Sequence, residues 1–257
     1  MPGRIVQLLD QWHLRKVQDR WTGAADEAAG MEPFALRTLR AEARAMRRQI
    51  DRLIHVADHR LGLPALGSGL PRMPLGTDWG WRPDVWRGPI AVPGAVAETA
   101  RTTISDDLAV YHDCPLGEVA LRQVRNGGEA DRTPFGLALD VFGFRGSFLS
   151  LAVALPEAAT TGLKARHLIR VEIVADSDRP LMGFARLNIK HGPNVEQMVS
   201  SLPSEGREKI AEFDLAYARI DEQRVERAWL DLIFSNPAMT RITLRDLAVS
   251  RRPRAEL

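Results

Sequence analysis

Apolar residues in the first sixty positions recur at the spacing of helices. Residues 4–20 place apolar side chains on one face of a short amphipathic helix. Residues 33–61 continue with a heptad stripe sustained over three repeats. Gly23 and Gly30 predict a break between the helices, and Gly62 with Pro64 predicts the end of the second. The pattern predicts a helical arm over residues 1–62. The stripe consists of Leu36, Leu39, Ala43, Met46, Ile50, Leu53 and Ala57.

The predicted second helix is also basic, with seven arginines between residues 37 and 60. A solvated arginine face is the simpler interpretation, and contact with an anionic membrane surface or nucleic acid is the alternative. The apolar stripe has to bury against another surface. We expect packing within the chain, on the first helix or the following domain; a homodimer through residues 36–57 is the alternative.

Residues 63–99 are rich in proline and glycine and predict a connector without a long helix. Three of the six tryptophans lie here within eight residues. Their rings could stack on sugars while neighbouring arginines supply directional hydrogen bonds. The other interpretation is that the tryptophans plug the edge of the next domain. The residues are Trp79, Trp81, Trp86, Arg82 and Arg87.

From residue 100 the apolar pattern changes to period two. One example is Leu149, Leu151 and Val153, and glycine or proline punctuates the runs. Short alternating runs without long helical patterns predict a jelly-roll-like antiparallel β-sandwich over residues 100–252. In the last run the apolar face changes between Leu244 and Leu247, which predicts a β-bulge near residues 245–246. The expected fold class is mainly β with a helical N-terminal arm.

Composition narrows the function classes. The formal net charge of +2 does not imply a nucleic-acid partner, and a single cysteine, Cys114, excludes a disulfide within the chain. No stretch approaches the ~18 consecutive apolar residues of a membrane span. The start of the chain lacks the apolar run and cleavage site of a signal peptide, so a cytoplasmic location is expected.

Motifs for catalysis or cofactors are absent from the sequence. It has no phosphate-binding glycine loop, no H-E-x-x-H and no G-x-S-x-G, and we expect neither a metal nor a cofactor. Asp106, Asp107 and Asp140 are candidates for a hydrolytic acid pair, with strand ends and salt bridges as the simpler interpretation. His191 and Asn194 lie in a strand-end loop that is either a binding loop or a plain turn.

Three segments carry a resemblance. Residues 184–194 (FARLNIKHGPN), 229–237 (WLDLIFSNP) and 244–247 (LRDL) resemble a group of uncharacterised alphaproteobacterial proteins classed as a domain of unknown function. That resemblance implies no activity. The closing strands also resemble those of jelly-roll carbohydrate-binding modules, whose final strand has the pattern I-x-L-x-D seen here at Ile242, Leu244 and Asp246. This second resemblance implies a fold and no ligand residue.

Together these patterns favour a bacterial, non-catalytic β-sandwich module that binds a glycan or similar ligand. The alternatives are an assembly or interaction protein that acts through the 34–61 helix, and a hydrolase on a β-sandwich scaffold. Trp79, Trp81, Trp86, Arg82, Arg87, His191 and Asn194 are the predicted ligand-binding residues.

Overall fold

A computed structural model describes residues 4–65, 74–128, 131–180 and 182–254, with side chains from Trp12 onward except for 48, 51–52 and 54–65. The predicted stripe residue Ala57 therefore lies outside the described side chains. The chain forms two compact units, residues 1–53 and 54–257.

The first unit is helical. It contains α1 (Arg4–Glu27), the short 3-10 turn η1 (Ala28–Gly30) and the first part of α2 (Pro33–Ala65). α1 continues through Gly23, past its predicted end near residue 20, because one glycine costs only about 1 kcal/mol in a helix interior and the alanines that follow favour it. The break comes after Gly30, where Met31 is extended and Pro33 starts α2. An ion pair of 3.0 Å between Arg20 and Glu42 joins the two helices.

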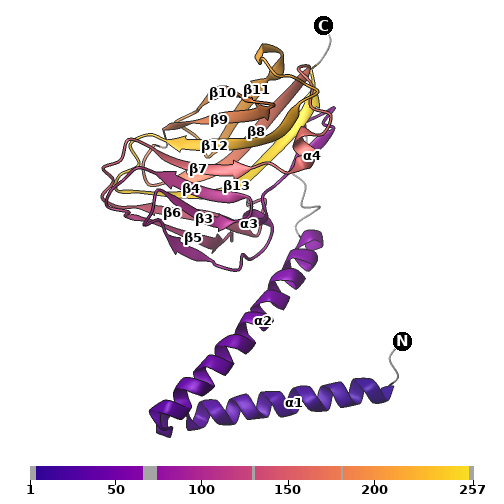
Figure 1. Cartoon of the computed structure of the whole chain (residues 1–257), viewed down its shortest axis with the longest axis vertical. Coiled ribbons are helices and arrows are strands. Elements are labelled where there is room, and N and C mark those ends of the chain that lie inside the picture. The colour runs from indigo at the N-terminus through magenta and orange to yellow at the C-terminus, as the bar shows by residue number, and fades with distance from the viewer. Residues whose placement is uncertain (1–3, 66–73, 129–130, 181, 255–257) are drawn as a thin grey trace. The chain divides into compact units, whose positions relative to one another are not determined.

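The second unit is a sandwich of two antiparallel sheets (Figure 1). One sheet has seven strands in the order β11-β8-β13-β6-β5-β2, with β1 also paired to β13, and the other has six in the order β10-β9-β12-β7-β4-β3. The strands are β1 (Trp79–Trp81), β2 (Gly94–Val96), β3 (Arg101–Ser105), β4 (Leu108–His112), β5 (Val119–Arg125), β6 (Phe135–Val141), β7 (Leu149–Ala154), β8 (His167–Ser177), β9 (Gly183–His191), β10 (Asn194–Leu202), β11 (Glu208–Asp214), β12 (Val225–Phe234) and β13 (Thr240–Pro253). Three short helical turns, α3 (Asp84–Arg87), α4 (Glu157–Thr160) and η2 (Leu215–Tyr217), complete it.

Alternate residues of both sheets form the core. Leu149, Leu151 and Val153 of β7 are fully buried, as are Leu137 and Leu139 of β6. This is the inward half of the two-residue pattern, because successive strand side chains point to opposite faces. The predicted jelly-roll-like antiparallel sandwich is confirmed.

The proline- and glycine-rich segment contributes strands of its own. β1 pairs with β13, with Trp79 opposite Arg251, and β2 pairs with β5. Each has only three residues, which is too short to produce an alternating pattern in the sequence. The domain limits predicted at residues 62 and 99 stay predictions, but strand pairing already begins at Trp79.

The predicted β-bulge is confirmed. The register between β13 and β8 shifts between Leu244 and Asp246. A bulge removes backbone groups from the ladder, and they need other partners when buried. The Trp86 indole N–H donates to the Leu244 carbonyl (2.9 Å), and Asn126 and Thr133 donate to the Arg245 carbonyl (2.9 and 2.8 Å). Side chains from outside the strand therefore hold the bulge.

Asn126→Ala is expected to lower the free energy of unfolding by about 1–2 kcal/mol, because it leaves part of the bulge unsatisfied. Thr133 still donates to the Arg245 carbonyl in this variant, so the carbonyl keeps one hydrogen bond and the destabilisation stays moderate. Urea unfolding followed by fluorescence measures it. Asn194→Ala, at an exposed position at the start of β10, is the matched control and should change stability by less than about 0.5 kcal/mol. Equal effects of the two changes would contradict the capping role.

Candidate functional site

The outer face of the six-stranded sheet is hollowed along its middle. There β7 and β4 present small side chains, Ser150, Ala152 and Ala154 from β7 and Ala109 from β4. In register, Ala152 lies between Ala109 of β4 and Asp231 of β12. Small residues on two adjacent strands, flanked by larger residues on the outer strands, produce a groove.

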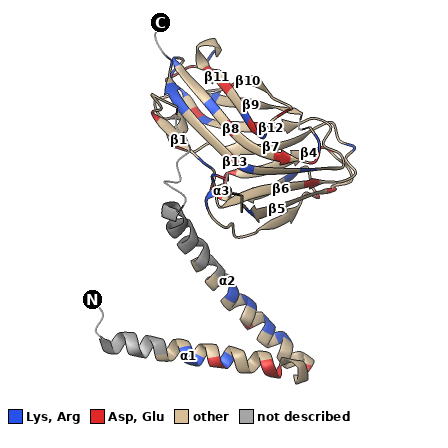
Figure 2. Cartoon of the chain, turned by 180° about the vertical axis from the view of Figure 1, so that it is seen from behind, with Lys and Arg blue, Asp and Glu red and all other residues tan. Residues whose placement is uncertain are grey.

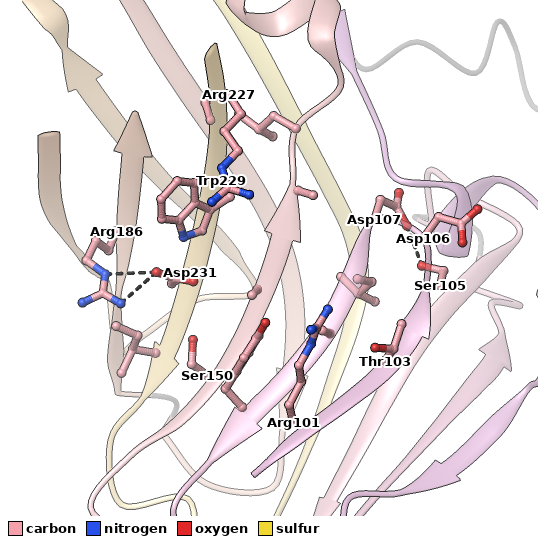
Figure 3. A pocket seen from close by; sticks show the side chains of 18 of the residues that line it. Arg101, Thr103, Ser105, Asp106, Asp107, Ser150, Arg186, Arg227, Trp229 and Asp231 are labelled. Carbon is pink, nitrogen blue, oxygen red and sulfur yellow. Dashed lines mark hydrogen bonds and ion pairs between the residues drawn. The ribbon is translucent and has the colours of Figure 1, made fainter. Parts of the chain in front are cut away.

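The groove has a volume of about 900 Å³, at the upper end of the range for small-molecule sites (Figure 3). Trp229, Asp231 and Arg186 form one side, from β12 and β9. Arg101 and Thr103 of β3 form the other side. Because Phe148 and Leu155, just beyond the two ends of β7, also line it, the groove follows this strand.

Asp231 is held by a hydrogen-bond network that runs across three strands. Its Oδ2 accepts from Arg186 Nε (3.0 Å) and Nη2 (2.8 Å) and from Asn188 Nδ2 (2.8 Å). Gln197 of β10 in turn donates to Asn188 Oδ1 (3.0 Å). Asp231 is only 6% exposed, and its Oδ1 accepts no hydrogen bond from any described residue. One carboxylate oxygen at the groove is therefore open to a ligand donor.

Ser150 is a second polar group without a partner. Its Oγ is buried and makes no hydrogen bond to any described part of the chain. An unsatisfied buried hydroxyl costs about 1–3 kcal/mol, which makes it a natural place for a ligand polar atom. In register Ser150 lies between Tyr111 and Ile233, one row along from Asp231. A hydroxyl can both donate and accept.

Two arginines stack on aromatic rings at opposite sides of the groove (Figure 3). The guanidinium of Arg227 lies 5.3 Å from the ring centre of Trp229, and that of Arg101 lies 5.8 Å from that of Tyr111. Such cation–π contacts keep the guanidinium groups in place without neutralising them. Neither arginine forms an ion pair with a carboxylate of the described residues.

Asp107 lies in the turn between β3 and β4 at one end of the groove. Burial raises the pKa of its carboxyl group above the ordinary value, while hydrogen bonds from the Ser105 hydroxyl and the Asp84 backbone N–H lower it less. The neighbouring Asp106 is exposed, and Asp140 lies on the other sheet in ion pairs with Arg122 and Arg241. The structure therefore places Asp106 and Asp107 at the groove and Asp140 away from it.

The outer face of the seven-stranded sheet differs in character, because ion pairs link its strands. Arg170 of β8 contacts Glu172 and Glu212 at 2.8 and 3.2 Å, and Arg132 contacts Glu208 at 2.6 Å. Its charges are largely paired with one another. Paired charges of this kind are typical of a solvated face. The unengaged polar groups described above lie instead in the groove of the six-stranded sheet.

The tryptophan segment lies against the seven-stranded sheet. Trp86 is fully buried, and Trp79 and Trp81 are partly buried against the core. Arg82 is 5% exposed and donates two hydrogen bonds to Asp246, of 2.7 and 3.0 Å. These side chains make contacts within the protein, and ligand binding by them stays a prediction.

The other predicted ligand residues lie elsewhere. Arg87 pairs with Asp84 at 3.2 Å, next to the tryptophan segment. His191 is buried at the end of β9, where its Nδ1 accepts from the Asp221 backbone N–H (3.2 Å), and Asn194 is exposed at the start of β10. The seven predicted residues are thus divided between the two sheets. The groove was missed, although the small residues of FLSLAVA (148–154) alternate with large ones.

Among the described residues, no group of three or more His, Cys, Asp or Glu side chains is placed to hold a metal ion. None of the described helices combines the length and the apolar character needed to cross a bilayer.

Comparisons with known proteins complete the description. The sequence model of a family described only as a family of unknown function matches residues 1–257. No curated protein matches the chain.

Several solved structures are similar. The enzymatically active domain of tailspike protein 4 from bacteriophage CBA120 has 7% identity and a TM-score of 0.40 over 56% of this chain, which spans only 19% of that one. The family 11 carbohydrate-binding module from Clostridium thermocellum, in complex with a mixed-linked tetrasaccharide, has 12% identity and a TM-score of 0.37 over 65% of this chain and 99% of that one. The CBM22-1 xylan-binding domain of Paenibacillus barcinonensis Xyn10C has 9% identity and a TM-score of 0.36 over 63% of this chain and 94% of that one. At these TM-scores the sandwich architecture rests on the strand pairing itself, and no ligand is carried over.

Proposed function

Because this chain belongs to the DUF6478 family of unknown function, its role has to be inferred from its own residues, and we propose that it is a non-catalytic module that binds a carbohydrate chain in the groove of the six-stranded sheet. The proposal keeps the glycan ligand expected from the sequence. It moves the contact surface from the tryptophan segment to β7, β12 and the strands beside them.

The observation that carries the proposal is a pair of unengaged polar groups in the groove, one of them, the Ser150 hydroxyl, fully buried. Asp231 Oδ1 is an acceptor held rigidly by Arg186 and Asn188, and Ser150 Oγ is a donor and acceptor. Sugar hydroxyls match both, because each hydroxyl donates and accepts. A ligand that bonded to Ser150 Oγ would remove the energetic penalty of leaving this hydroxyl buried without a partner, and the same ligand could donate to Asp231 Oδ1.

The shape and the apolar surface support the same ligand. Ala109 and Ala152 make the middle of the groove shallow in side-chain bulk. The half-buried Trp229 ring, with the Arg227 guanidinium stacked on it, gives a flat surface against which the C–H side of a sugar ring can pack. β7 has six residues and is about 20 Å long. Because the groove follows this strand, its length suits a chain of several sugar rings better than a single ring.

Isothermal titration of the full chain against soluble plant, microbial and host polysaccharides tests the proposal. We expect heat of binding with at least one class, and Trp229→Ala should weaken that binding by at least about 30-fold, the effect of a central tryptophan worth about 2 kcal/mol. Trp12→Ala is the matched control, because Trp12 is 52% exposed on α1, outside the groove. It should leave the affinity unchanged.

Two outcomes would contradict the assignment of the groove as the binding site. One is the absence of binding heat with every polysaccharide class. The other is binding that survives Trp229→Ala and is lost in a folded Trp79→Ala variant, which would return the ligand to the tryptophan segment.

Hydrolysis of the bound glycan is the second candidate function. Asp107 and Asp231 line the same groove, and burial raises the pKa of Asp107, as a general acid requires. Release of reducing ends during incubation with the bound polysaccharide, lost in Asp107→Asn, would favour it. Binding without release would leave the binding module.

A further inference from the structure

The helical unit carries an apolar surface that the groove does not explain. On α2, Met46 is 42%, Ile50 49% and Leu53 68% exposed, whereas Leu39 and Ala43, nearer the turn to α1, are half-buried. Leu36, at the start of the stripe, is also 36% exposed, so most of the described stripe lies at the surface of this unit. A continuous exposed apolar stripe marks an interaction surface.

Basic residues also recur along the described part of α2 (Figure 2). Arg37, Arg40, Arg44 and Arg47 are all exposed, and their spacing of three and four residues places them on one face of α2. Residues 33–53 contain six arginines against two acids, Glu42 and Asp51. The row is strongly cationic.

α1 makes its contact with α2 on the side opposite the arginine row. α1 contacts α2 through the Arg20–Glu42 ion pair. Each residue turns a helix by about 100°, so Glu42 lies on the side opposite Arg40. The arginine row therefore faces away from this contact, whereas Met46, one turn after Glu42, lies on the contact side and is still 42% exposed. Arg47 and Ile50, three residues apart, lie next to each other at the border between the row and the stripe.

We propose that α2 docks on an anionic lipid surface, with the Met46–Ile50–Leu53 stripe at the headgroup–acyl boundary and the arginine row over lipid phosphates and carboxylates. A helix with an apolar face beside an arginine-rich face lies in a membrane interface in this way. Guanidinium groups bind such oxyanions bidentately. The inference is independent of the groove.

A second copy of the chain would cover the stripe but leave most of the arginine row without an acidic partner across the pairing. In a parallel heptad pairing, Arg40 and Arg47 face positions 35 and 42 of the other copy, which are Ala35 and Glu42, so only Arg47 faces an acid. Arg37 and Arg44 occupy b positions and point away from the other copy. A nucleic acid would pair with the arginines but leave the stripe uncovered. An anionic bilayer satisfies both surfaces at once.

Vesicle flotation of the full chain tests the proposal. We expect binding to phosphatidylcholine vesicles containing about 30% phosphatidylserine, with at least about tenfold weaker binding to pure phosphatidylcholine. About 0.5 M NaCl should reverse most of it. Arg40→Gln with Arg47→Gln, and separately Ile50→Asp, should each reduce binding about tenfold or more.

Two exposed arginines of the second unit supply the matched control. Arg179→Gln with Arg219→Gln removes the same charge and should leave vesicle binding unchanged. Circular dichroism confirms the helices of each variant, and glutamine is nearly as good a helix former as arginine. Equal binding to neutral and anionic vesicles, or equal loss in both double variants, would overturn the proposal.

The competing occupants give distinct results. A dimer by light scattering that Ile50→Asp dissociates, without vesicle binding, would assign the stripe to a second copy. Binding to duplex DNA or RNA without vesicle binding would assign the arginine row to nucleic acid. Either result would refute lipid docking.

Discussion

Arg82→Ala is expected to lower the free energy of unfolding by about 3–5 kcal/mol. Both partners of the Arg82–Asp246 pair have side chains 4% exposed, so the change leaves a buried carboxylate without its cation. Asp246 also stands directly after the register shift in β13, where the strand is held by contacts from outside the ladder. Urea unfolding at neutral pH, followed by tryptophan fluorescence, measures the loss.

The matched comparison is the ion pair of the exposed Arg122 with Asp140, which also pairs with Arg241. Arg122 is 48% exposed, and Arg122→Ala should lower stability by less than about 1 kcal/mol. Replacing both buried partners, as Arg82→Met with Asp246→Leu, should recover much of the loss because no buried charge remains. A loss below about 1 kcal/mol for Arg82→Ala alone would show that the buried pair is not what fixes this segment.

Ala152→Trp is expected to weaken carbohydrate binding by at least about 100-fold, about 2.7 kcal/mol. Ala152 lies in the middle of the groove between Ala109 and Asp231, where an indole would occupy the space of the ligand. Its side chain points away from the core, so the fold should persist. Titration with the polysaccharide that binds the unaltered chain measures the effect.

The control for this substitution lies on the other sheet. Ala120 of β5 is half-buried on the seven-stranded sheet, and Ala120→Trp should leave the affinity within about twofold. Unfolding curves of both variants separate a blocked groove from a damaged fold. Undiminished binding by a folded Ala152→Trp variant would move the ligand away from β7.

The sandwich could be predicted because its strands alternate. The alternation of Leu149, Leu151 and Val153 predicts a strand with one buried face. The change of apolar face between Leu244 and Leu247 predicts the position of the bulge. β1 and β2 were not predicted, because a run of three residues is too short to show a two-residue alternation. Their position depends on pairing with strands that are distant in the sequence. The end of α1 was missed because Gly23 is tolerated inside the helix.

The groove was harder to foresee because it depends on which strands are neighbours. Trp229 and Asp231 lie far from Ser150 and Ala152 in sequence, and β12 meets β7 only because the sheet order is not the chain order. The small outward residues of β7 were visible. What faces them across the sheet follows from topology, which periodicity alone does not determine.

The way the bulge is held also decides where the autonomous folding unit begins. A proteolytic fragment starting at residue 100 would lack β1 and β2, and with them Trp86 and Arg82, so the Leu244 carbonyl and the Asp246 carboxylate would be buried without these partners. A fragment starting at Pro74 would retain every one of these contacts. The tryptophan-rich stretch is therefore an integral part of the sandwich, and limited proteolysis should leave it attached.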